Sequence, residues 1–181
     1  MSSIVAIAGS PSTGSRTVAL AEHLARDLRE DGHHVRVEAV RALPAEALLG
    51  ADATDPQIAD AVAAVAAADA VIVASPVYKA AYSGVLKAFL DLLPPGALAG
   101  KAVLPLLTGA APIHTLALDY ALRPVLVALG AQPVVTGLFL LDKQIDRTPG
   151  GVTLGPDTRA AVEAALRELV AALPATAGVR P

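Results

Sequence analysis

Residues 4–17 read IVAIAGSPSTGSRT, an apolar run that ends in a loop rich in glycine and hydroxyl side chains. A helical pattern follows at once, so the stretch predicts a strand, a loop and a helix. Gly9 and Gly14 let backbone N–H groups of the loop turn inward, and the next helix directs its positive end to the same place. We therefore expect an anion to bind at the carboxyl end of this strand.

The polar side chains of the loop indicate which anion it suits. Four hydroxyls and one guanidinium can donate hydrogen bonds, from Ser10, Ser12, Ser15, Thr17 and Arg16. Such donors suit a phosphate monoester better than a polyphosphate, which needs a metal ion. A serine-rich turn that merely caps a helix is the alternative, and the position after the first strand of an alternating chain makes it the weaker one.

Other phosphate-binding and catalytic motifs are missing. Residues 9–14 have the glycine spacing of a Walker A loop, but Ser15 and Arg16 stand where its lysine and its magnesium-binding Ser or Thr belong. The apolar run 71–74 does not end in an Asp that could hold magnesium. These departures argue against an NTPase. Neither the dinucleotide fingerprint G-x-G-x-x-G nor the hydrolase motif G-x-S-x-G occurs.

Composition limits the kind of protein. The 181 residues fit a single domain, which we place at 1–174, with a tail at 175–181 that we expect to be disordered. Apolar residues make up 54% and aromatic residues 3%, so Ala, Val, Leu and Ile must build the core. A net charge of −3 gives no electrostatic case for nucleic acid or a membrane surface.

The absence of cysteine limits the chemistry. It excludes disulfides, thiol catalysis and Cys-ligated metals, so we expect no metal site and chemistry supplied by a cofactor. The N-terminus has no charged leader followed by a long apolar region, and no apolar run reaches transmembrane length. We therefore expect a cytoplasmic protein.

The rest of the chain alternates between predicted strands and helices. We expect strands at 4–8, 34–40, 70–74, 102–107 and 133–140. We expect helices at 18–31, 83–93, 112–129 and 156–173, and a long surface loop at 142–155. A further helix opens with Asp55 as its N-cap and Pro56 at its first position, and Ile58, Val62 and Val65 mark its buried face. Five alternating pairs predict an α/β three-layer sandwich, a five-stranded parallel sheet with helices on both faces. We choose the flavodoxin-like order 2-1-3-4-5, which brings together the loops after strands one, three and four.

A second motif is more specific than the first. Residues 75–84 read SPVYKAAYSG, and together with GSP at 9–11 and DYALRPVL at 119–126 they resemble the NADPH-dependent FMN reductases. More narrowly, the chain is similar to the flavin reductase component of two-component alkanesulfonate monooxygenases. The resemblance runs from the first strand beyond the fourth predicted helix, and it does not extend to 142–155.

The resemblance implies a site for FMN. Its phosphate would lie in the first loop, on Ser10, Ser12, Ser15, Arg16 and Thr17. Its ring would lie between the second and third loops, which supply Pro76, Val77, Tyr78, Thr108, Gly109 and Ala110. The family often has a glycine at the position of Ala110.

The resemblance also implies a mechanism. NADPH stacks on the flavin and transfers hydride, backbone N–H groups near Gly109 meet the negative charge of the reduced ring, and no side-chain acid or base is required. Reduced FMN would then leave for a partner FMN-dependent monooxygenase, with sulfonate desulfonation as the expected overall reaction. We expect Tyr78 to flank the flavin, and His114 to be a polar residue at a helix start rather than a catalytic one.

Pro124 affects the backbone of the fourth predicted helix at Tyr120. Pro124 has no N–H to donate to the carbonyl of Tyr120, so the fourth helix should kink or widen there. Members of the family carry a π-type bulge at the matching tyrosine, at a subunit interface tied to flavin transfer. The resemblance therefore implies a homodimer or homotetramer, and a plain proline kink is the alternative.

Two other functions fit the same fold. One is a quinone, azo or chromate reductase that retains FMN, and the other is an electron carrier of the flavodoxin type. A carrier is disfavoured because the chain offers neither an acidic docking surface nor aromatic side chains to sandwich the ring. The sequence leaves open the choice between NADPH and NADH, and the identity of the partner oxygenase.

Overall fold

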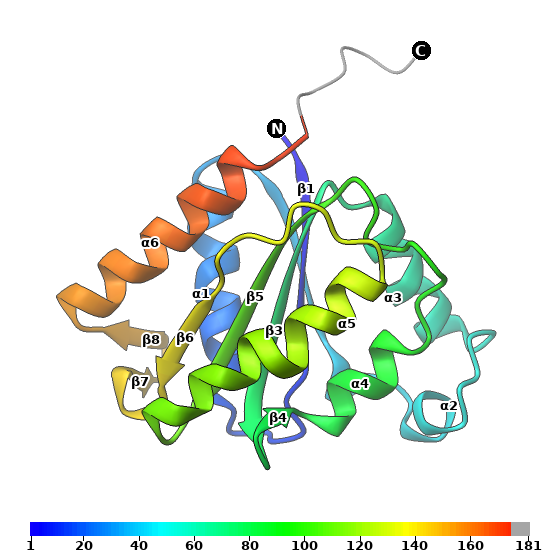
Figure 1. Cartoon of the computed structure of the whole chain (residues 1–181), viewed down its shortest axis with the longest axis horizontal. Helices are drawn as coiled ribbons and strands as arrows, with labels where there is room; N and C mark the ends of the chain where they lie inside the picture. The colour runs from blue at the N-terminus through cyan, green and yellow to red at the C-terminus, as the bar shows by residue number, and fades with distance from the viewer. Residues whose placement is uncertain (175–181) are drawn as a thin grey trace.

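The protein folds around a parallel sheet with helices on both faces (Figure 1). The structure is a computed structural model that describes residues 1–174, so the tail predicted at 175–181 lies outside the described residues. Its strands are β1 (Ser3–Ala8), β2 (His34–Ala39), β3 (Ala70–Tyr78), β4 (Ala81–Tyr82), β5 (Ala102–Gly109), β6 (Leu138–Leu141), β7 (Ile145–Thr148) and β8 (Gly151–Leu154).

The predicted strand order is confirmed. The parallel strands lie in the order β2-β1-β3-β5-β6, which is the flavodoxin-like order 2-1-3-4-5 of the five strands predicted. Residues of β1 alternate between the two faces, with Ile4 and Ala6 in one core and Val5 and Ile7 in the other. Each face therefore has its own apolar layer, as a sheet covered on both sides requires.

Helices cover the two faces unequally. The helices α1 (Arg16–Glu30) and α6 (Pro156–Ala171) pack on one face. The other face is covered by α2 (Ala45–Leu49), α3 (Pro56–Ala67), α4 (Gly84–Leu90) and α5 (Arg123–Ala128). None of the helices among residues 1–174 is both long and apolar enough to cross a membrane.

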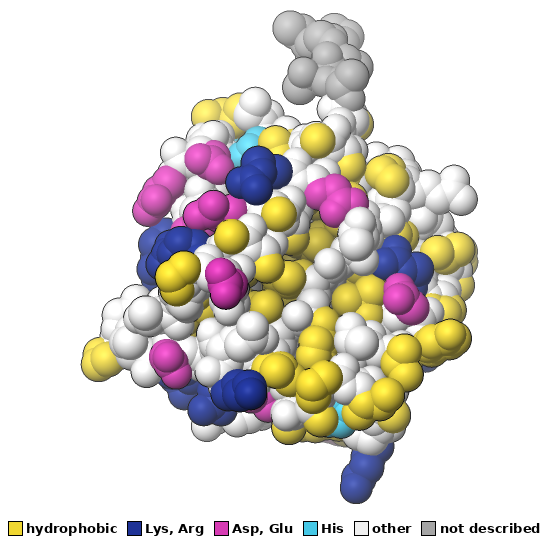
Figure 2. Space-filling view, turned by 60° about the vertical axis from the view of Figure 1, so that its left-hand side comes forward, with side chains coloured by type: hydrophobic (Ala, Val, Ile, Leu, Met, Phe, Trp, Pro, Cys, Tyr) yellow, Lys and Arg dark blue, Asp and Glu magenta, His cyan; other side chains and the backbone are white. Residues whose placement is uncertain are grey.

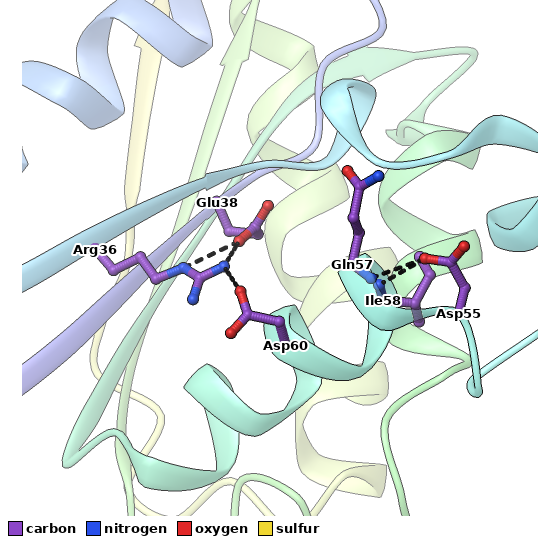
Figure 3. A network of polar contacts seen from close by, with 6 residues as sticks. All are labelled: Arg36, Glu38, Asp55, Gln57, Ile58 and Asp60. Carbon is purple, nitrogen blue, oxygen red and sulfur yellow. Dashed lines mark hydrogen bonds and ion pairs between the residues drawn. The ribbon is translucent and has the colours of Figure 1, made fainter.

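Short polar contacts fix the edge strand β2 to α3 (Figure 3). The Arg36 guanidinium donates to Glu38 and to Asp60, at 2.7 Å in each case. The hydrogen bond from Arg36 lowers the pKa of the Asp60 carboxyl below its ordinary value. Asp55 caps α3 as predicted, because its carboxylate accepts from the N–H groups of Gln57 and Ile58.

Two short antiparallel additions to the predicted fold come from turns. Strand β4 pairs with the end of β3, and the turn between them places Lys79 and Ala80 at φ of 50° and 63°. Two successive residues with positive φ are typical of a type I′ turn, which usually contains Asn or Gly. This turn contains neither Asn nor Gly, so the sequence did not indicate it. The prediction of five strands was therefore incomplete, because it missed β4.

The second addition corrects the long loop predicted at 142–155. After a single 3-10 turn, η4 (Asp142–Gln144), the chain forms the antiparallel hairpin β7–β8. Ile145 and Leu154 are paired and buried, whereas residues 146–148 are exposed. A hairpin that buries so few apolar side chains has no clear two-residue period, which is why its sequence resembled a loop.

The fourth predicted helix changes its winding along its length. It begins as a 3-10 turn, η2 (Pro112–Thr115), becomes a π-helix, η3 (Leu118–Leu122), and ends as α5. The predicted widening at Tyr120 is therefore confirmed, and it ends at Leu122, two residues before Pro124, whose ring nitrogen cannot donate a hydrogen bond.

The fifth predicted strand is shorter than expected. Only Leu138–Leu141 pairs continuously with β5, and Val134 forms an isolated bridge to Val103. Gly137 between them has a φ of +94°, which interrupts the extended backbone.

Candidate functional site

A cavity of about 380 Å³ opens where the parallel strands end. It lies at the carboxyl ends of β1, β3, β5 and β6, the edge at which open α/β sheets bind ligands. Every residue that we predicted to bind the cofactor lines it: Ser10, Ser12, Ser15, Arg16, Thr17, Pro76, Val77, Tyr78, Thr108, Gly109 and Ala110.

The first loop is fixed by close packing at its start. The N–H of Gly9 donates to the carbonyl of Ala74 at 2.8 Å, and the hydroxyl of Ser83 donates to the carbonyl of Gly9. A Cβ atom on Gly9 would lie 2.4 Å from the Cβ of Leu86 in α4. Only glycine therefore lets β1, β3 and α4 approach closely enough to hold the loop in place.

The serine hydroxyls of the loop order its backbone. Ser10 accepts from the N–H of Ser12 at 3.4 Å, and Ser12 accepts from the N–H of Gly14 at 3.3 Å. Ser15 caps α1 by accepting from the N–H of Val18 at 3.2 Å. In each contact the serine oxygen is the acceptor, so its O–H can still donate to an anion.

A buried hydroxyl pair connects the first and third loops. The Oγ1 atoms of Thr17 and Thr108 are 2.7 Å apart, and both side chains are buried. Thr17 lies in the first turn of α1 and Thr108 near the end of β5. The pair therefore fixes the distance between the predicted phosphate and ring sites.

The second and third loops lie side by side. Pro76 is the register partner of Thr108, because β3 and β5 are neighbouring parallel strands. Tyr78 ends β3 with 47% of its surface exposed. Between these loops, apolar side chains and backbone groups face one cavity, which suits a flat ring with polar edges.

The match to a known family is extensive. A family model described as NADPH-dependent FMN reductase matches residues 2–146. The chain belongs to the NADPH-dependent FMN reductase family. Two relatives named FMN reductase (NADPH) support this: the one from Pseudomonas putida KT2440 is 48% identical over 147 residues, covering 81% of this chain and 75% of that one. The one from Escherichia coli K12 is 45% identical over 142 residues, covering 78% and 74%.

A solved structure agrees with these matches over nearly the whole chain. The apo crystal structure of the NADH:FMN oxidoreductase EMOB superposes with a TM-score of 0.89 and 42% identity, covering 99% of this chain and 94% of that one. The predicted enzyme class, an NADPH-dependent FMN reductase, and its cofactors, FMN and NADPH, are thus confirmed by the family match.

Three further residues of the reductase line the cavity that were not predicted to bind the cofactor. They are Gly14, His114 and Asp142. Asp142 directly follows β6, and the strand-end pattern that identified the other loops could have found it. Among residues 1–174 there is no group of three or more His, Cys, Asp or Glu placed to hold a metal ion.

His114 packs against the third loop of the reductase. A Cβ on Gly109 would lie 2.9 Å from its Nδ1, which is buried and has no hydrogen-bond partner in the described part of the chain. His114 also lines a second, apolar cavity of about 320 Å³ with Ile113 and Tyr120 among its other lining residues. Tyr120 therefore lies beside the cavity at the strand ends rather than in it, and Pro124 lines neither cavity.

The close packing at Gly9 can be tested by substitution. Gly9→Ala places a methyl group against the Cβ of Leu86, and we expect the free energy of unfolding to fall by about 1–3 kcal/mol because of this overpacking. Gly84→Ala is the control, since nothing lies within 4 Å of a Cβ there. It should change stability by less than about 1 kcal/mol. Urea unfolding followed by circular dichroism measures both, and equal stability of the two variants would contradict this account.

Proposed function

We propose that the reductase binds FMN in the cavity as a substrate, reduces it with NADPH and releases it to a partner FMN-dependent monooxygenase, with sulfonate desulfonation as the overall process. The observation that carries this proposal is the lining of the cavity. Among the described residues that line it, the aromatic side chains are those of His114 and Tyr78, and Tyr78 is 47% exposed. A site without a second aromatic ring to sandwich the flavin favours modest affinity and release.

The residues of the cavity fit FMN in two parts. We assign the phosphate to the hydroxyls of Ser10, Ser12 and Ser15, the Arg16 guanidinium and the first turn of α1. We assign the ring to the space between residues 76–78 and 108–110. Glycine at positions 14 and 109 lets neighbouring side chains pack against these loops, since a Cβ there would lie 3.2 Å from Arg147 and 2.9 Å from His114.

Catalysis in this proposal depends on position and backbone dipoles. FMN, when bound, supplies the chemistry that accepts hydride. The third loop holds the ring edge by its peptide groups, and the buried Thr17–Thr108 pair holds that loop relative to the phosphate site. The apolar side chains of Pro76 and Val77 exclude water from one side of the ring site. No side-chain proton donor is needed for these steps.

The proposal includes a dimer or tetramer formed through the π-helical region. The segment from η2 to η3 exposes Ile113, Leu116 and Tyr120 by 66%, 47% and 81%. Hydrophobic side chains also gather at the lower right of the face shown in Figure 2. Exposed apolar clusters of this kind favour association. Because His114 lines both this region and the FMN cavity, association there would adjoin the flavin.

The substrate role of FMN is tested by steady-state NADPH oxidation with free FMN varied from none to a large excess. We expect no turnover without added FMN and a rate that saturates with FMN. Arg16→Ala should raise the KM for FMN about tenfold and change kcat little, because a charged hydrogen bond to the phosphate is lost. A yellow protein that oxidises NADPH without added FMN and needs a quinone acceptor would contradict the proposal.

The association surface is tested by adding a charge to it. Ile113→Glu should shift the protein from a dimer or tetramer to a monomer in light scattering, because burying a carboxylate in an apolar interface is costly. Leu49→Glu is the matched control, since Leu49 is 77% exposed in α2 and should leave the oligomer intact. A monomeric parent protein, or an oligomer that Ile113→Glu leaves unchanged, would refute this interface.

A further inference from the structure

The hairpin β7–β8 is attached to the helix that begins at the phosphate loop. The Nε of Arg16 donates to the carbonyl of Ile145 at 3.2 Å, at the start of the hairpin. Near its turn, an Nη atom of Arg26 donates to the carbonyl of Gly150 at 3.5 Å. Both arginines belong to α1, so the hairpin is held alongside this helix at two points.

This attachment places a third arginine, Arg147 of β7, beside the first loop at Gly14. A terminal nitrogen of Arg147 lies 3.2 Å from the position that a Cβ would take on Gly14. Gly14 lines the FMN cavity, so the guanidinium stands at its rim. Any residue with a side chain at position 14 would crowd the guanidinium, and glycine thereby allows it to approach the loop.

The charge of Arg147 is not used elsewhere in the described residues. The hydrogen bonds and ion pairs found within residues 1–174 include none from its side chain, which is exposed. Asp146, its neighbour, points to the opposite side of the hairpin because side chains alternate along a strand. The positive charge of Arg147 therefore remains available to a ligand.

The charges within the cavity explain why a further cation matters. Arg16 and Asp142 are the charged side chains that line it, and their charges are opposite. The Nε of Arg16 donates to the carbonyl of Ile145, so its terminal nitrogens remain available to a ligand. A phosphate monoester carries nearly two negative charges at neutral pH. With Arg147 the two guanidiniums outweigh the Asp142 carboxylate and leave a net positive charge for the phosphate, whereas Arg16 alone is offset by Asp142.

We propose that Arg147 is a second phosphate-binding residue, which together with Arg16 clamps a phosphate monoester at Gly14. This inference rests on the proposed function, and it adds the hairpin β7–β8 to the ligand site. Two substrates of the reaction carry such a group, FMN at its ribityl end and NADPH at its ribose 2′ position. Riboflavin and NADH are the matching molecules without it, so the two sources can be separated.

The test compares the parent protein with Arg147→Ala, Arg147→Lys and the control Arg26→Ala. Titration of flavin fluorescence gives the Kd of FMN and riboflavin, and steady-state kinetics at saturating FMN give the KM of NADPH and NADH. If the clamp holds FMN, Arg147→Ala raises the Kd of FMN about tenfold and leaves that of riboflavin unchanged. If it holds the nucleotide, the KM of NADPH rises about tenfold and that of NADH does not. Arg147→Lys should recover part of either loss, since it keeps the charge without the planar fork.

Arg26→Ala removes an arginine that also contacts the hairpin, at Gly150 rather than at Gly14. It should leave all four constants within about twofold of the parent values, as expected for a surface contact. Constants that are unchanged in Arg147→Ala, an equal loss for both members of a pair, or the same loss in Arg26→Ala would each overturn the inference. Failure of the parent protein to bind or reduce FMN would instead refute the proposed function.

Discussion

The site depends on one constraint, which is that β1, β3, β5 and β6 run parallel and end at the same edge of the sheet. Because their registers are fixed, Pro76 lies beside Thr108, and the N–H of Gly9 reaches the carbonyl of Ala74 at the end of β3. Loops that are far apart in the sequence thus form one cavity. The packing of Gly9 on Leu86 and the Thr17–Thr108 hydroxyl pair then set the fine positions of these loops.

The cavity is built largely from small and hydroxyl-bearing residues, and this shapes what the protein does with a flavin. A flavoprotein that retains its cofactor needs much buried contact with the ring, and large aromatic side chains supply it most efficiently. Here serine, threonine, glycine and alanine dominate the lining, and Tyr78 is half exposed. Most of the side-chain donors come from the first loop, to which we assign the phosphate. Recognition would therefore depend on the phosphate more than on the ring, which suits a flavin that enters, is reduced and leaves.

Strong local signals made most of the fold predictable from the sequence. The β-branched run 70–74, the Asp55–Pro56 helix start and the glycine-rich loop at 9–14 each have a direct physical cause, and they predicted the sheet order and the first loop of the cavity. The cavity residues at 76–78 and 108–110 were assigned from the resemblance to the family. Pro124 predicted that the helix kinks or widens at Tyr120, because its nitrogen carries no N–H, and the resemblance to the family indicated the π-type form that the structure shows. The hairpin β7–β8 could not be found in this way. Its stability comes from contacts with α1, such as that of Arg16 with Ile145, and contacts of that range leave no period in the sequence. For the same reason, nothing in the sequence pointed to Arg147, whereas Asp142 directly follows β6 and could have been found from the strand-end pattern.

A crystal structure of the protein with FMN would test the central claim most directly. The account predicts the phosphate within hydrogen-bond distance of the hydroxyls of Ser12 and Ser15 and of the Arg16 guanidinium, with the ring between residues 76–78 and 108–110. An FMN molecule bound elsewhere, or one in this cavity with its ring at the first loop and its phosphate at the third, would contradict the account.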